Sequence, residues 1–178
     1  ELTDWNIYSP VWAPVSLEDQ WLKLQDKDPF DYAKVERKIP ASKELKVSFD
    51  LKAGQNNKGT LHIEFLDENG IACSRIELTD DGIFRLKGGS RFANMMKYEA
   101  GKIYHVEAVL STVDRNIQVY VDGKRVGLRM FYAPVAAVER IVFRTGVPRT
   151  FPTVDTPADQ TYDLPNAGAQ DPLAEYGI

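Results

Sequence analysis

The sequence predicts an all-β fold in which two antiparallel sheets pack as a sandwich. Apolar and polar residues alternate along many short segments, and this period of two is typical of strands with one buried face. Turns rich in Gly, Asn and Asp separate the segments, and no stretch has a convincing helical pattern. Many short strands spaced by such turns indicate a β-sandwich.

The residues expected to face the core come from strands in the middle of the chain. Residues 45–51 alternate almost ideally, and residues 61–65 repeat the pattern after the turn at 55–59. Residues 72–78 and 83–86 extend the pattern beyond further turns. The clearest inward-facing residues are Leu45, Val47, Phe49, Leu51, Leu61, Ile63, Phe65, Val106, Ala108 and Leu110.

Residues 103–126 predict two antiparallel strands followed by a tight turn into a third. The first strand alternates from Tyr104 to Leu110, and the second repeats the alternation in the segment Ile-Gln-Val-Tyr-Val at 117–121. Asp122-Gly123 then supplies the strongest short-range signal for a hairpin turn. We therefore expect a three-stranded meander here.

The two ends of the chain differ from this regular part. Residues 1–17 are extended and aromatic, and they carry Trp5 and Trp12 among prolines that disfavour helix and central strand. Their rings either pack along an edge of the sandwich or present their faces to a sugar. Residues 147–178 are rich in proline and predict an extended tail that acts as a linker or as a strap on a neighbouring domain. We therefore expect the sandwich domain to span residues 1–146.

Composition argues against several classes of protein. The formal net charge of -4 and the absence of a basic block disfavour a nucleic-acid surface. No apolar run approaches the roughly 18 residues that cross a bilayer. Cys73 is the one cysteine, so no intrachain disulfide forms, and we expect a buried apolar residue there. The chain is expected to belong to a longer protein with a neighbouring domain.

Two features of the sequence could supply metal ligands: an acidic turn and two His/Glu pairs on strands. Three aspartates lie around a proline turn at residues 26–31, where calcium would find oxygen ligands on an irregular backbone; a plain acidic turn is the simpler interpretation. Pairs of residues two apart lie on one face of a strand, which permits a His/Glu metal site, as in His62 with Glu64 and His105 with Glu107. No other cofactor motif occurs, so apart from calcium no cofactor is expected.

The segment Tyr-His-Val-Glu-Ala-Val-Leu at 104–110, with Ile-Gln-Val-Tyr-Val-Asp-Gly at 117–123, resembles the hairpin of concanavalin A-like (laminin G-like) jelly-roll domains. The resemblance covers about residues 15–146 and implies a two-sheet jelly roll. The segments Trp-Asn-Ile-Tyr-Ser-Pro at 5–10 and Asp-Pro-Phe-Asp-Tyr-Ala at 28–33 look like accessory domains of secreted bacterial carbohydrate-active proteins. That similarity implies a secreted, periplasmic or cell-surface location beside a glycan-processing domain.

A ligand surface is expected on the polar face opposite the inward residues. We expect this one face to collect histidines, carboxylates and a tyrosine from strands far apart in sequence, so that the outward residues of 103–121 share it with those of 61–78. The simpler interpretation is a solvated face with cross-strand charge pairs, such as Glu64 with Arg75. The candidate ligand-binding residues are Trp5, Trp12, His62, Glu64, Glu77, His105, Glu107 and Tyr120.

The expected function is that of a non-catalytic accessory module, which binds carbohydrate or buttresses a catalytic domain. The alternative is a glycoside hydrolase or polysaccharide lyase that uses carboxylates on the concave sheet face. The resemblance implies a Glu-x-Asp-x(-x)-Glu signature for such an enzyme, and this signature is absent here: Glu77 is followed by Leu78 and Thr79. A non-catalytic role is therefore favoured, and no catalytic residue is assigned.

Overall fold

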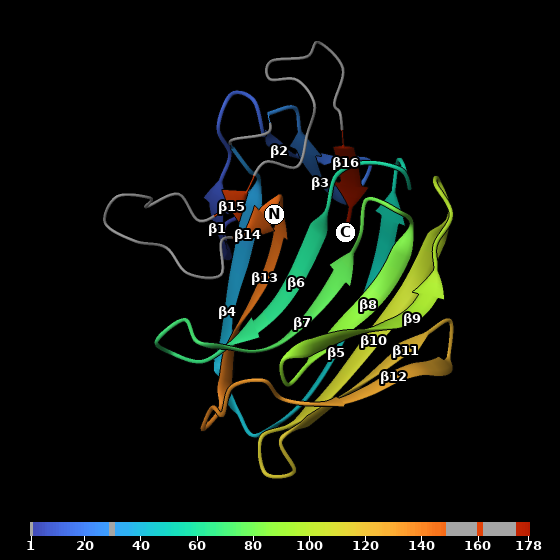
Figure 1. Ribbon diagram of the computed structural model, residues 1–178. Helices are drawn as coiled ribbons and strands as arrows, with labels where there is room; N and C mark the ends of the chain where they lie inside the picture. The colour runs from blue at the N-terminus through green and yellow to red at the C-terminus, as the bar shows by residue number, and fades with distance from the viewer. Residues whose placement is uncertain (1, 29–30, 149–159, 162–173) are drawn as a thin grey trace.

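The structure, a computed structural model, confirms the all-β sandwich (Figure 1). It describes residues 2–28, 31–148, 160–161 and 174–178, and none of these lies in a helix. Two antiparallel sheets of seven strands each pack face to face. In Figure 1 the sheet that contains β6, β7 and β8 lies in front, and the sheet that contains β5, β10 and β11 lies behind it.

The order of strands in both sheets mixes segments that are distant in sequence, which is the topology of a jelly roll. Sheet A consists, in spatial order, of β1 (Trp5–Tyr8), β4 (Lys34–Ser42), β13 (Val138–Thr145), β6 (Leu61–Leu66), β7 (Ala72–Leu78), β8 (Ile83–Gly88) and β9 (Arg91–Lys97). Sheet B consists of β12 (Lys124–Met130), β11 (Asn116–Val121), β10 (Ile103–Ser111), β5 (Glu44–Ala53), β16 (Ala174–Gly177), β3 (Trp21–Asp26) and β2 (Val15–Glu18). The short strands β14 (Val147–Pro148) and β15 (Gln160–Thr161) pair with each other.

The core lies between the sheets and is built by the alternating residues that the sequence indicates. Those on β6 and β10 are fully or almost fully buried, whereas those on the first part of β5 are half-buried and pack against the core from its end. Cys73 is buried, as expected, and burial raises the pKa of its thiol to about 12. The buried apolar residues of the predicted set are Leu51, Leu61, Ile63, Phe65, Val106, Ala108 and Leu110.

The predicted meander at residues 103–126 is confirmed. β10 pairs with β11, β11 pairs with β12, and the turn between the last two pairs Val121 with Lys124. Asp122 and Gly123 both have positive φ, 50° and 79°, as a type I′ turn requires. The other side of β10 pairs with β5 along its whole length, so the meander forms one half of sheet B.

The sandwich does not end at residue 146, where the sequence placed its boundary. β16 lies in sheet B between β3 and β5 and pairs with both. Its Tyr176 is fully buried, and Ile178 exchanges two backbone hydrogen bonds with Leu22. Residues 174–178 are therefore part of the fold. Residues 149–159 and 162–173, the bulk of the predicted tail, lie outside the described residues.

The N-terminal segment supplies an edge strand to each sheet. β1 pairs with β4, and β2 pairs with β3. Trp5 packs on Phe143 with ring centroids 6.3 Å apart, and the Arg37 guanidinium lies 5.7 Å from the Trp5 ring. Trp12 is 45% exposed. The two tryptophans therefore lie in different surroundings, one packed against the core and one facing solvent.

Candidate functional site: the outer face of sheet A

The register of sheet A places two rows of side chains on its face turned away from sheet B, called here the outer face of sheet A. Because side chains alternate along each strand, residues paired across strands share a face. The first row is Tyr8, Lys34, Arg144, His62, Glu77, Arg85 and Asn94. The second row is Asn6, Glu36, Val142, Glu64, Arg75, Lys87 and Phe92.

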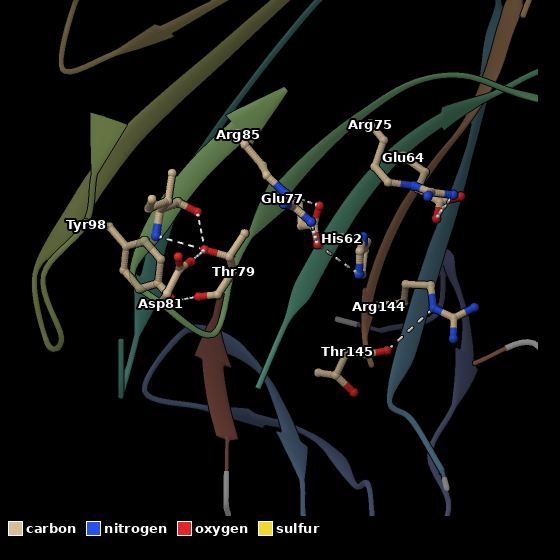
Figure 2. Close-up of polar contacts among 11 residues, drawn as sticks. His62, Glu64, Arg75, Glu77, Thr79, Asp81, Arg85, Tyr98, Arg144 and Thr145 are labelled. Atoms are coloured by element: carbon tan, nitrogen blue, oxygen red, sulfur yellow. Dashed lines mark hydrogen bonds and ion pairs between the residues drawn. The ribbon is translucent and has the colours of Figure 1, made fainter. Parts of the chain in front are cut away.

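Two arginine–glutamate pairs organise the centre of this face (Figure 2). Arg85 donates two hydrogen bonds to Glu77, from Nε at 2.6 Å and from Nη2 at 2.9 Å. Arg75 Nη2 lies 3.2 Å from Glu64 Oε1. The expected charge pair between Glu64 and Arg75 is thus present. Since both carboxylates are occupied by guanidinium groups, this arrangement does not favour either as a general acid.

His62 is the least satisfied polar group in the part of the face that the structure describes. Its side chain is 2% exposed, and neither ring nitrogen has a hydrogen-bond partner among the described residues. Nε2 lies 3.9 Å from Glu77 Oε1, which is too long for a hydrogen bond. Burial lowers the pKa of His62 well below its usual 6.5, and the charges of Arg75, Arg144 and Arg85 lower it further. The ring is therefore neutral at pH 7 and retains one free donor and one free acceptor.

We expect His62 to make the fold less stable in mild acid. Its folded pKa lies below its unfolded value, so the unfolded chain binds the proton first as the pH falls below about 6.5. Stability is then lost at up to about 1.4 kcal/mol per pH unit. Urea unfolding between pH 7.5 and 5.5 measures this loss. His62→Gln should flatten the dependence, whereas the same change at exposed His105 should keep it; equal profiles for both variants would contradict the assignment.

Aromatic rings border the charged centre on both sides. Near β1, Tyr8 and Tyr32 have ring centroids 4.8 Å apart, and the Arg144 guanidinium lies 4.1 Å from the Tyr32 ring. Near β9, Lys87 Nζ lies 4.6 Å from the Tyr132 ring and 5.6 Å from the Phe92 ring. The Arg85 guanidinium lies 4.3 Å from Phe92.

The second aromatic border contains further polar groups that can bind a ligand. Burial lowers the pKa of Lys87, and the charge of Arg75 adds to this effect. No ion pair of Lys87 occurs within the described chain. The Tyr132 hydroxyl and Arg75 Nε are buried and have no hydrogen-bond partner there. Donors and an aromatic wall therefore lie together at this end of the face.

The structure divides the predicted candidates between opposite sides of the molecule. His62, Glu64 and Glu77 lie together on the outer face of sheet A. The expectation that the outward residues of β10 and β11 share this face is wrong, because these strands belong to sheet B. Their candidates, His105, Glu107 and Tyr120, lie on the outer face of sheet B.

Each candidate on sheet B contacts a polar side chain nearby. His105 Nδ1 lies 2.8 Å from Asp50 Oδ1, and Lys46 Nζ lies 2.8 Å from Glu107 Oε2. The Tyr120 hydroxyl donates a 3.1 Å hydrogen bond to Gln118 on its own strand. The first two contacts are the ordinary cross-strand pairs of a solvated face.

Trp5 and Trp12 lie on neither of the two central rows. Trp5 lines an apolar hollow of about 460 Å³ that opens between the two sheets. Leu17, Phe49 and Ile178 are among its other lining residues. Trp5 thus lies at this hollow, and neither tryptophan is part of the charged centre of sheet A.

The described residues contain no group of three His, Cys, Asp or Glu side chains that could hold a metal ion. In the predicted acidic turn, Asp26 accepts a hydrogen bond from the backbone N–H of Asp28, and Asp31 accepts one from the Tyr8 hydroxyl. Asp31 also caps the backbone N–H of Tyr32. Calcium at this turn remains a prediction that the structure does not test.

The sequence does not single out several residues of this face. Arg85 and Lys87 lie at alternating positions of β8, and the sequence predicts a short strand there without indicating a ligand role. Tyr32 and Tyr132 come from loops, so no periodicity identifies them. Phe92 is on an edge strand, and its place beside Lys87 follows from the β8–β9 register alone.

The fold and this polar face define a concanavalin A-like jelly-roll domain, which confirms the resemblance found in the sequence. The family model described as "Sialidase-like, CBM domain" matches residues 5–160, and the chain belongs to this family; CBM denotes a carbohydrate-binding module. No curated protein matches the sequence.

Solved structures agree with this family. A protein titled "Sialidase" is 87% identical over the whole of this chain with a TM-score of 0.89, and this chain spans 16% of its length. An alginate lyase of polysaccharide lyase family 7 is 12% identical with a TM-score of 0.59, covering 99% of this chain and 92% of its own. The carbohydrate-binding module CBM66 from Bacillus subtilis is 11% identical with a TM-score of 0.53, covering 80% and 87%. These last two similarities show the fold alone.

The described part of the chain has no helix long and apolar enough to cross a membrane.

Proposed function

We propose that the chain is the non-catalytic carbohydrate-binding module of a secreted bacterial glycan-processing protein, and that the outer face of sheet A holds the glycan. The observation that carries the proposal is the composition of this face. Lys87 lies beside the rings of Phe92 and Tyr132, Phe92 is 36% exposed, and the partly exposed guanidinium groups of Arg75 and Arg85 lie on the same face. Sugars are bound through such directional polar groups together with aromatic faces that cover their C–H surfaces.

The family and the 87% identical relative support the same role. The chain belongs to a family of CBM domains, and the 87% identical relative titled "Sialidase" is about six times longer. A module that accompanies a glycan-processing catalytic domain would keep that domain on its substrate by raising the effective concentration. Sialylated glycans are therefore the first ligands to test.

Affinity electrophoresis and calorimetry test this proposal with sialylated glycoprotein, its desialylated form and a panel of neutral polysaccharides. The 178-residue chain should bind at least one of them. The double variant Lys87→Gln/Phe92→Ala should weaken that binding by about tenfold or more, the size of one lost aromatic contact. Phe92 is 36% exposed, so its truncation leaves the core intact.

A matched double variant on the other sheet serves as the control. Lys46→Gln/Tyr120→Ala removes the same two side-chain types from the outer face of sheet B and should leave glycan binding within about twofold. Equal losses from both variants would contradict the choice of face. A wild-type chain that binds no glycan would contradict the proposed function.

A buttressing role is the second candidate, because a specific observation favours it. The hollow of about 460 Å³ between the sheets is apolar, with Trp5, Leu17 and Ile178 on its walls. Leu17 is exposed on this wall, and Val11 and Trp12 are exposed in the loop between β1 and β2. Apolar surface of this kind suits a docked neighbouring domain, and a chain without glycan binding in the experiment above would favour this role.

A further inference from the structure

Strands β9 and β12 are the last strands of their sheets on the same side of the sandwich, and they lie against each other (Figure 1). Two glycines allow this close approach. A Cβ at Gly127 of β12 would lie 2.6 Å from Met95 Sδ, and a Cβ at Gly88 of β8 would lie 2.7 Å from Arg129 Cβ. The open side of the sandwich is thus closed by tight contact between two edge strands, called here the β9–β12 edge.

This edge carries an excess of positive charge. β9 reads RFANMMK and β12 reads KRVGLRM, so neither strand contains a carboxylate, although the whole chain has a formal net charge of -4. The two strands carry five cations, which are Arg91, Lys97, Lys124, Arg125 and Arg129. None of the five forms an ion pair among the described residues.

The two arginines that contact other groups leave their charge uncompensated. Arg125 Nη1 donates a 3.4 Å hydrogen bond to the neutral amide oxygen of Gln118. Arg129 Nη1 donates a 2.9 Å hydrogen bond to the carbonyl of Leu128. Guanidinium groups that are held in place by neutral partners remain available to an anion, and they lose little side-chain entropy when the anion binds.

The edge is also hollowed along its length. One hollow of about 340 Å³ is lined by Leu86, Asn94 and Arg129, and a second of about 540 Å³ by Tyr104, Lys102 and Lys124. The two hollows share the lining residues Met95, Arg125 and Val126, so they adjoin, and together they are called here the β9–β12 trough. The lining of the trough therefore combines apolar side chains with the cations Lys102, Lys124, Arg125 and Arg129.

Two carboxylates lie near this trough and are engaged elsewhere. Asp122 lines the second hollow, and its Oδ1 accepts a hydrogen bond from the backbone N–H of His105. Glu99 pairs with Lys102 at 3.3 Å. Cations still outnumber carboxylates around the trough. Its lining also includes methionine, valine and leucine side chains.

We propose that the β9–β12 trough binds a polyanionic glycan, a polysaccharide with carboxylate or sulfate groups along its chain. This inference rests on the proposed carbohydrate-binding function and assigns to it a second surface, which borders the outer face of sheet A at Asn94. Regularly spaced anions meet the lining cations, while the C–H surfaces of the sugar rings cover Met95, Val126 and Leu128. A linear polymer matches a trough made of two adjoining hollows better than a single sugar does.

The experiment titrates the 178-residue chain with heparin, which is sulfated, with polygalacturonate, which is carboxylated, and with neutral dextran. We expect binding to at least one polyanion, no binding to dextran, and an affinity that falls as salt rises from 50 to about 300 mM. The triple variant Lys124→Gln/Arg125→Gln/Arg129→Gln should bind at least about tenfold more weakly and show a smaller salt dependence. Preference for heparin or for polygalacturonate identifies the anionic group.

A triple variant with the same loss of charge provides the control. Lys43→Gln/Lys52→Gln/Lys58→Gln removes three exposed cations outside the edge, and it should stay within about twofold of the wild type. Equal weakening in both triple variants would overturn the proposal, as would equal binding of poly-glutamate, since either result means that net charge alone is recognised. Absence of binding to both polyanions would also overturn it.

The two multiple variants distinguish a failure of the trough from a failure of the proposed function. The outer-face double variant Lys87→Gln/Phe92→Ala should retain polyanion binding within a few-fold, and the edge triple variant should retain binding of the glycan found for sheet A. Loss of edge binding alone therefore overturns the trough without affecting the proposed function.

Discussion

Removal of residues 174–178 is expected to prevent the chain from folding. β16 occupies a position inside sheet B, so its loss leaves the facing edges of β3 and β5 without their partner. It also removes Tyr176, which is fully buried, and truncation of one such ring costs about 3–5 kcal/mol. Domains of this size have about 5–15 kcal/mol of stability in total. Circular dichroism and urea unfolding of the shortened chain measure the effect.

Three single substitutions test this expectation in smaller steps. Tyr176→Ala should lower the free energy of unfolding by about 3–5 kcal/mol, whereas Tyr176→Phe keeps the ring in the core and should cost less than about 2 kcal/mol. Gly59→Ala should also be costly, because Gly59 has a φ of 69° and an added Cβ would collide with Ala174. A shortened chain with a native-like unfolding midpoint would contradict the assignment of β16 to the fold.

The second large effect is expected from Glu77→Gln. The Glu77 side chain is 3% exposed and accepts two hydrogen bonds from Arg85, so the neutral amide leaves the guanidinium without its counter-charge in a largely buried place. We expect a loss of about 2–4 kcal/mol in the free energy of unfolding. Arg85 is 34% exposed, and partial solvation keeps the loss from being larger.

Glu107→Gln is the matched control, since it removes a carboxylate from a pair on the outer face of sheet B. Lys46, its partner, is well exposed, so the loss should stay below about 1 kcal/mol. A similar small loss for both variants would contradict a stabilising role of the buried Arg85–Glu77 pair, because Glu77 would then behave as a surface residue.

The sequence was sufficient to predict the fold class and the individual strands. Period-two alternation depends on local burial, so it identified the strands that carry Leu61 and Val106 and the faces that they bury. The Asp122-Gly123 turn was predictable for the same reason, since its backbone conformation is set by two adjacent residues. β16 was not, because four residues after a proline-rich stretch carry too little pattern to indicate pairing with β3 and β5.

The candidate site was predicted in part, and the error has a clear physical origin. Alternation tells which residues share one side of a strand, but it does not tell to which sheet the strand belongs. His62 and His105 were therefore assigned to one face, whereas β6 and β10 lie in different sheets. The aromatic borders at Tyr32 and Tyr132 depend on loop conformations, which no sequence period specifies.

Backbone amide chemical shifts test most directly whether the outer face of sheet A is the ligand surface. They are mapped while the chain is titrated with a glycan that it binds. We expect the largest shifts on β6, β7 and β8, at residues around His62, Glu77 and Arg85, with further shifts beside Tyr132. Shifts confined to the outer face of sheet B, around His105 and Tyr120, would contradict this expectation.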